Sequence, residues 1–180
     1  MENAGSPWSV PVTVEDIPDT GLHLDIEAPD AVRPALAKLA DVRALPRLSA
    51  AFDLTKRGAG VHVAGRVRAR VGQTCVVTLE PMETDVDEAV DLAFAPAPEG
   101  VDVELEADGK KHRTDDDPPE PLVNGKVDLG AIATEFLILG IDPYPRKPGA
   151  QFAAPKVEDA GANPFAALEA LKKRPGGGQS

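Results

Sequence analysis

Hydrophobic and polar residues alternate most clearly between Val61 and Val71. The odd positions are apolar or small (Val61, Val63, Gly65, Val67, Ala69 and Val71), and the even positions are His62, Ala64, Arg66, Arg68 and Arg70. Successive side chains of a strand point to opposite faces, so this period of two predicts a strand with one face toward a core and the other toward solvent. Gly58 and Gly60 come just before it and predict a tight turn from a preceding strand.

Similar segments elsewhere predict further strands joined by short turns. They are residues 8–14, with Pro11 placing the strand at an edge, and residues 21–28, 74–79, 85–96 and 101–108. Consecutive strands with short connections form an antiparallel meander. In the last of these segments Asp102, Glu104 and Glu106 share one face, opposite Val101, Val103 and Leu105.

Two segments have helical spacing. In residues 29–42, Asp30 can cap a short helix that carries Val32, Leu36 and Leu39 on one side. Residues 128–141 predict a second helix, with Asp128 as the N-cap and Gly140 as the C-terminal stop. Its residues are apolar nearly all round and Glu135 is its only internal charge, so we expect this helix to be largely buried.

These elements predict one α+β domain over residues 1–147. We expect an antiparallel, strongly bent or barrel-like β-sheet with two packed helices, and a mobile acidic loop near residues 107–121. Residues 148–180 are rich in Pro, Gly and Ala and predict a disordered C-terminal tail. Within that tail, residues 163–173 predict a short amphipathic helix. Its apolar side, Phe165, Leu168 and Leu171, would dock on the chain's own domain or on a partner.

The composition limits the compartment and the kind of core. The chain has 180 residues, 42% of them hydrophobic but only 4% aromatic, so the core should be aliphatic. No apolar run approaches the roughly 20 residues that a membrane span needs, and the N-terminus lacks the pattern of a signal peptide. With a single cysteine as well, we expect a cytoplasmic protein that does not enter a membrane.

Charge is strongly segregated along the chain. The net charge is −11, which argues against a protein that wraps nucleic acid by bulk electrostatics, yet residues 43–73 carry seven basic residues against one acid. This segment supplies candidate contacts to RNA phosphates: Lys56, Arg57, His62, Arg66, Arg68 and Arg70. The alternative is that the arginines pair across strands with Asp102, Glu104 and Glu106, which have the same spacing and the opposite sign.

Other polar groups give weaker signals. Asp115, Asp116 and Asp117 lack the alternate spacing of a calcium loop, so the choice is between a solvated loop and a surface for a basic protein. Cys75 has no second cysteine, so we expect a small buried strand residue, without a metal or a cofactor. Glu135 lacks a second carboxylate at a catalytic spacing, and no known catalytic motif is present, so we expect no enzyme activity.

Several motifs together resemble the YceD-like family of large ribosomal RNA subunit accumulation proteins. They are "CVVTLEP" followed by an acidic strand ending in "LAFAP", then "VDLGAIATEFLILGIDPYPRKPG" and the terminal "NPFAALEALK". Cys75, Leu79 and Pro81 match the family's C-x-x-C-L-x-P pattern, and Glu135 matches its helix glutamate. Thr78 stands where the second cysteine would be, so a metal or redox role that needs both thiolates is not expected.

The resemblance implies a non-catalytic factor in ribosome biogenesis. Such a protein would support the accumulation or processing of large-subunit ribosomal RNA, and two modes of action remain open. The basic strand face would contact precursor RNA, or the acidic surface would act as a chaperone or adaptor for a basic ribosomal protein. A third and remote hypothesis is that the protein hydrolyses RNA or nucleotides with the help of Glu135.

Overall fold

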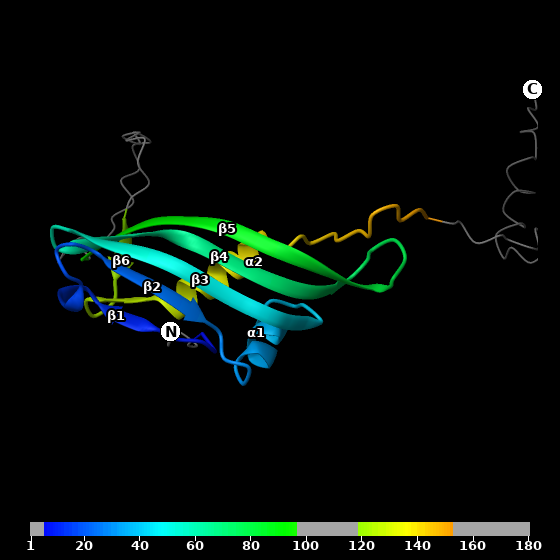
Figure 1. Cartoon of the computed structure of the whole chain (residues 1–180), viewed down its shortest axis with the longest axis horizontal. Helices are drawn as coiled ribbons and strands as arrows, with labels where there is room; N and C mark the ends of the chain where they lie inside the picture. The colour runs from blue at the N-terminus through cyan, green and yellow to red at the C-terminus, as the bar shows by residue number, and fades with distance from the viewer. Residues whose placement is uncertain (1–5, 97–118, 153–180) are drawn as a thin grey trace, which may run out of the picture.

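The structure is a computed structural model that describes residues 6–96 and 119–152. It contains a long, twisted sheet with one helix across its rear face (α2) and a second at one end (α1; Figure 1). The elements, in chain order, are β1 (Pro11–Thr13), the 3-10 helix η1 (Val14–Asp16), β2 (Leu22–Glu27), α1 (Arg33–Leu39), β3 (Ala44–Arg57), β4 (Gly60–Thr74), β5 (Pro81–Pro96), β6 (Glu120–Leu122), β7 (Lys126–Asp128) and α2 (Leu129–Gly140). The α+β class is confirmed.

Among the described residues, the main sheet has five strands in the order β2-β3-β4-β5-β6, and β1 pairs with β7 in a separate ribbon. The pairs from β2 to β5 are antiparallel as predicted, but β6 runs parallel to β5, so the sheet is mixed. The barrel-like closure we predicted is wrong, because β2 and β6 are opposite edges of an open sheet. The core is closed by α2 lying across one face, so the sheet need not close on itself.

The predicted hairpin between β3 and β4 is confirmed. Gly58 adopts a positive φ of 60° in the turn, and the strands pair from Arg57 with Gly60 as far as Arg47 with Arg70. The odd positions of β4 face inward and the arginines face outward, as the alternation predicts. We call the side that carries the arginines the outer face and the side against α2 the inner face.

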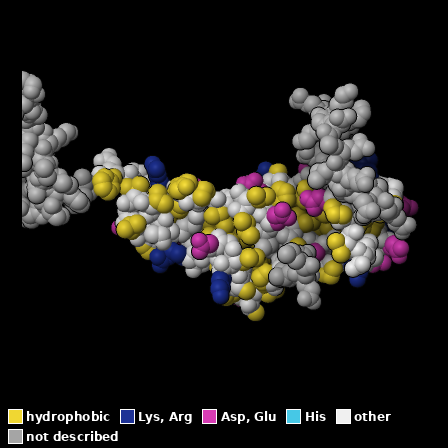
Figure 2. All heavy atoms as spheres, turned by 180° about the vertical axis from the view of Figure 1, so that it is seen from behind, with side chains coloured by type: hydrophobic (Ala, Val, Ile, Leu, Met, Phe, Trp, Pro, Cys, Tyr) yellow, Lys and Arg dark blue, Asp and Glu magenta, His cyan; other side chains and the backbone are white. Residues whose placement is uncertain are grey.

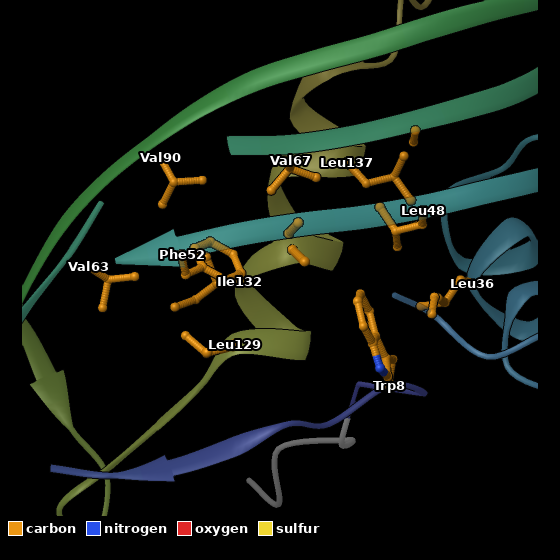
Figure 3. Close-up of a cluster of buried hydrophobic side chains, with 14 of the residues drawn as sticks. Trp8, Leu36, Leu48, Phe52, Val63, Val67, Val90, Leu129, Ile132 and Leu137 are labelled. Carbon is orange, nitrogen blue, oxygen red and sulfur yellow. The ribbon is translucent and has the colours of Figure 1, made fainter. Parts of the chain in front are cut away.

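The core lies between the inner face and α2. Phe52, Val63 and Val67 from the sheet meet Ile132 and Leu137 from the helix, with Trp8 and Leu36 completing the cluster from the N-terminal segment and α1 (Figure 3). Burial of these aliphatic and aromatic side chains is the main force that holds the helix on the sheet.

Asp128 fixes the start of α2. Its side chain accepts hydrogen bonds from the backbone N–H groups of Gly130 and Ala131, which confirms the predicted N-cap. The same carboxylate accepts hydrogen bonds from the Val10 N–H and the Ser9 hydroxyl, and so ties the N-terminal segment to the helix. The helix ends at Gly140, as expected, where a Cβ would lie 2.5 Å from Val86 Cγ1 on β5.

The helices differ from the expectations in two respects. Half of the residues of α2 are buried, but Glu135, Ile138 and Leu139 face solvent. The sheet covers only one side of it, so the apolar residues on the other side stay exposed. In α1 the N-cap is Val32 without a side-chain hydrogen bond, and Asp30 instead pairs with the Arg33 guanidinium.

The strand that we predicted at residues 74–79 is also wrong. The strand β4 runs on to Thr74 and β5 begins at Pro81, so residues 75–80 form the turn between them. The Cys75 N–H donates to the Glu80 carbonyl, and Leu79, at a φ of 59°, donates back to the Cys75 carbonyl. The apolar residues of this turn give the sequence pattern of a strand, although the chain reverses its direction there.

Several predicted features lie outside the described residues. They are the strand at 101–108, most of the acidic loop, including Asp115, Asp116 and Asp117, and the amphipathic segment 163–173. The last residues of the predicted loop are described, and β6 begins there at Glu120. Among the described helices, none has both the length and the apolar character to cross a membrane.

Candidate nucleic-acid interface

Four arginines gather on one end of the outer face. Arg66, Arg68 and Arg70 occupy alternate positions of β4, and Arg47 on β3 lies directly opposite Arg70. The neighbouring outer positions of β3 are the small residues Ser49, opposite Arg68, and Ala51, opposite Arg66. We call Arg47, Ser49, Arg66, Arg68 and Arg70 the arginine surface. Alternate residues of a strand are about 6.6 Å apart, a separation comparable to that of neighbouring phosphates along a nucleic-acid strand.

Each guanidinium has a carboxylate beside it. Arg70 makes a bidentate pair with Asp85 of β5, with N–O distances of 2.9 and 3.0 Å. Arg66 and Arg68 share Asp87, at 3.3 and 3.6 Å from their Nε atoms, and Arg47 lies 3.8 Å from Glu27 of β2. The side chains of the four arginines remain 52–68% exposed. Exposed pairs of this kind contribute little to stability, so the arginines can exchange these partners.

The Arg70–Asp85 pair is the tightest of these interactions. The hydrogen bond between the two side chains, more than their charges, raises the pKa of Arg70 and lowers the pKa of Asp85. Both groups are therefore ionised at neutral pH. Phosphate oxygens compete with Asp85 for the same fork of guanidinium donors.

The arginine surface contains hollows that a ligand can enter. Two adjoining hollows are both lined by Arg47, Ser49 and Arg68. The first is also lined by Arg70, and the second by Arg66. The two hollows together are lined by the four arginines and by four carboxylates, Asp25, Glu27, Asp85 and Asp87, so positive and negative groups are balanced there.

The other predicted RNA contacts do not join this surface. Lys56 lies on the opposite side of the sheet, where its ammonium group donates to the Glu15 carbonyl. Arg57 is at an outward-facing position of β3, but it lies at the hairpin end of the strand. His62 lies beyond Ala64 on β4 and pairs with Asp91 at 2.7 Å. Only Arg66, Arg68 and Arg70 of the predicted set are brought together.

The carboxylate partners differ from those that the sequence suggested. The predicted acidic row Asp102, Glu104 and Glu106 lies outside the described residues, whereas Asp85 and Asp87 pair with the arginines. Arg47 and Ser49 were not predicted as part of the surface. A signal existed for both, because a turn at residues 58–59 fixes the hairpin register and places residue 47 opposite residue 70.

Histidine and aspartate residues occupy the other end of the outer face. His23 of β2 lies 2.7 Å from Asp53 and 3.5 Å from Asp25, and the hydrogen bond that its ring donates to the Asp53 carboxylate raises its pKa. Among the described residues, no group of three or more histidine, cysteine or acidic side chains is arranged to hold a metal ion. The described part of the outer face also carries no Phe, Tyr or Trp on which a base could stack.

Cys75 lies at a junction between the β4–β5 turn and the segment that follows α2. It is fully buried, as expected, but in a turn and not in a strand. Its sulfur accepts the backbone N–H groups of Thr78 at 3.5 Å and Lys147 at 3.4 Å. Lys147 also pairs with Glu80 at 2.8 Å, and the Val76 N–H donates to the Pro145 carbonyl. Cys75 therefore helps to hold two distant segments together.

We predict that the Cys75 thiol ionises near pH 6. Hydrogen bonds from the Thr78 hydroxyl and the Lys147 N–H outweigh the opposing effect of burial and lower the thiol pKa to about 6. An unfolded cysteine keeps its proton up to about pH 8.5, so stability should rise with pH between these values and be lost as the pH falls through the folded pKa. The ultraviolet absorbance of the thiolate measures this titration, with Cys75→Ser as the blank. A midpoint in the ordinary range above pH 8 would contradict these hydrogen bonds.

The remaining family-motif residues lie apart from the arginine surface. Leu79 is exposed in the β4–β5 turn, and Pro81 begins β5. Glu135 is exposed on α2 and forms no ion pair with the described residues. A solvent-exposed carboxylate that has no ion-pair partner among the described residues does not support the hypothesis that the protein is a hydrolase.

The fold and this surface define an α+β protein that exposes an arginine-bearing sheet face. The family model described as large ribosomal RNA subunit accumulation protein YceD matches residues 63–172. The match covers more than half of the chain, and the chain therefore belongs to this family. Comparisons with curated proteins and with solved structures gave no match.

Proposed function

We propose that this protein supports the accumulation of large-subunit ribosomal RNA by binding the precursor RNA through the arginine surface, without catalysis. The family name links its members to this RNA. The observation that carries the proposal is the gathering of four exposed guanidinium groups around two adjoining hollows. Phosphates bind such groups as bidentate acceptors.

The carboxylates beside the arginines set the strength of this binding. Glu27, Asp85 and Asp87 must give up their arginines before a phosphate takes their place, so binding is weaker than for a bare basic patch. The strong negative charge of the whole chain also repels RNA approaching elsewhere. Together these effects confine the RNA to the arginine surface and keep the binding reversible. Reversible binding lets the protein dissociate from the RNA at a later stage.

The chemistry of the outer face favours recognition of the RNA backbone. Arginines and a serine hydroxyl contact phosphate and sugar oxygens, whereas reading of unpaired bases needs aromatic stacking. The described strands of this face carry no Phe, Tyr or Trp, and their histidines, His23 and His62, lie at the end away from the arginine surface. We therefore propose that helical segments of the precursor are bound, with little preference for sequence.

A pull-down at low salt tests the function. The tagged full chain is recovered from lysate in two halves, one treated with nuclease. We expect large-subunit RNA in the untreated half, accompanied by ribosomal proteins that nuclease removes. If instead a basic ribosomal protein stays bound after nuclease and no large-subunit RNA is enriched, the protein is an adaptor and the RNA contact is wrong.

A further inference from the structure

An apolar hollow lies where the end of α1 meets the exposed side of α2. Leu39, Ile138 and Leu139 bring side chains that are 53%, 41% and 69% exposed. The hollow is also lined by Ser6, Ala131, Thr134 and Glu135. Figure 2 views the molecule from the side of α2 and shows hydrophobic side chains gathered there, with acidic side chains among them.

Exposed leucine and isoleucine side chains that adjoin one another typically mark a surface that is covered in the working protein. Here they come from two helices and line one hollow, so a single apolar element can cover all three. None of the described residues packs over them, and Leu139 is among the most exposed large hydrophobic residues.

We propose that residues 163–173 of the same chain occupy this hollow as a short amphipathic helix. The sequence places Asn163 as the cap, Pro164 at the first helical position, and Phe165, Leu168 and Leu171 on one side. A helix of this length is unstable in isolation and forms only where its apolar side is buried. The hollow supplies aliphatic surface of the kind that this side needs.

Charge favours the same occupant. Lys172 and Lys173 follow Leu171 directly at the end of the segment, and Glu135 lies at the hollow without an ion pair among the described residues. A lysine at the C-terminal end of a docked helix is favoured by the helix dipole and by a nearby carboxylate.

The length of the connection sets how far the segment can reach. Lys147 is fixed at the β4–β5 turn through Cys75 and Glu80, and the structure describes the chain as far as Phe152, so residues 153–162 form the connector. Fully extended, these residues span up to roughly 35 Å. The match to the family model continues to residue 172 and so includes nearly all of this segment.

Disulfide trapping tests the proposal in the full chain. Leu139→Cys is combined with Leu168→Cys, and Val123→Cys with Leu168→Cys is the control, since Val123 is similarly exposed at another site. Cys75 is retained because it has no exposed surface. Docking raises the effective concentration of the two thiols, so we expect the 139–168 bond to form within one chain at least about tenfold faster than the control bond.

Charge and face variants make the test specific. Lys172→Glu places a second negative charge against Glu135 and should slow the trapping, whereas Ala170→Gln, on the opposite side of the predicted helix, should leave its rate unchanged. Equal rates for the two cysteine pairs would overturn the proposal. Disulfides that form only between two chains would overturn it as well, because the segment would then dock on a second copy.

Discussion

Replacing Phe52 with alanine should cost about 3–5 kcal/mol of the free energy of unfolding, the largest expected effect of any single substitution here. Phe52 has no exposed surface and lies at the centre of the cluster between β3, β4 and α2 (Figure 3). Its cross-strand partner is Gly65, where an added Cβ would lie 2.7 Å from the Phe52 ring. The ring therefore fills space that Gly65 leaves open, and its removal creates a cavity that no neighbouring side chain can fill.

Denaturant unfolding measures this loss, with the fluorescence of the buried Trp8 as the probe. Thr55→Ala on the same strand is the control: Thr55 is exposed, and its replacement should cost less than about 1 kcal/mol. A Phe52→Ala protein that loses as little as this control would mean that α2 does not pack against the inner face.

Replacing Arg66, Arg68 and Arg70 together with glutamine should weaken binding to a large-subunit RNA fragment by about 10–100-fold at low salt. Each lost phosphate contact also flattens the dependence of the affinity on salt, so the slope of log K against log salt should fall by about 2. Both quantities follow from one titration series at several salt concentrations.

A matched control separates the site from the change in net charge. Lys38, Lys126 and Arg146 are exposed and lie outside the arginine surface, and their replacement with glutamine removes the same number of charges. This variant should lose less than about threefold in affinity. Asp87→Asn frees Arg66 and Arg68 and should tighten binding. Equal losses in the two triple variants would show that RNA responds only to overall charge.

The alternation in the sequence predicted the strands of the hairpin and the faces of β4 correctly. A period of two is strict over this segment, and Gly58 marks the turn, so the register and the shared face of Arg66, Arg68 and Arg70 follow directly. Asp128 likewise combines a capping side chain with an apolar run, which fixes the start of α2.

The errors have a common origin in tertiary contacts. Cys75 and Leu79 lie in an apolar stretch that resembles a strand, but hydrogen bonds to Glu80 and to residues 145–147 close it into a turn. Because a strand was predicted at residues 74–79, the pairing of β4 with β5, which places Asp85 and Asp87 beside the arginines, was not predicted. Lys56 next to Arg57 looks equally basic in the sequence, yet one residue of offset places it on the other face.

The central claim is that RNA contacts the arginine surface, and a nuclear magnetic resonance titration of the arginine side chains tests it most directly. The Nε–H resonances of the unmodified protein are followed as a large-subunit RNA fragment is added. We predict that those of Arg47, Arg66, Arg68 and Arg70 shift, because their carboxylate partners are exchanged for phosphates. Arg33, held by the Ala28 carbonyl, should not move. Binding of RNA that leaves the four resonances of the arginine surface unchanged would contradict the claim.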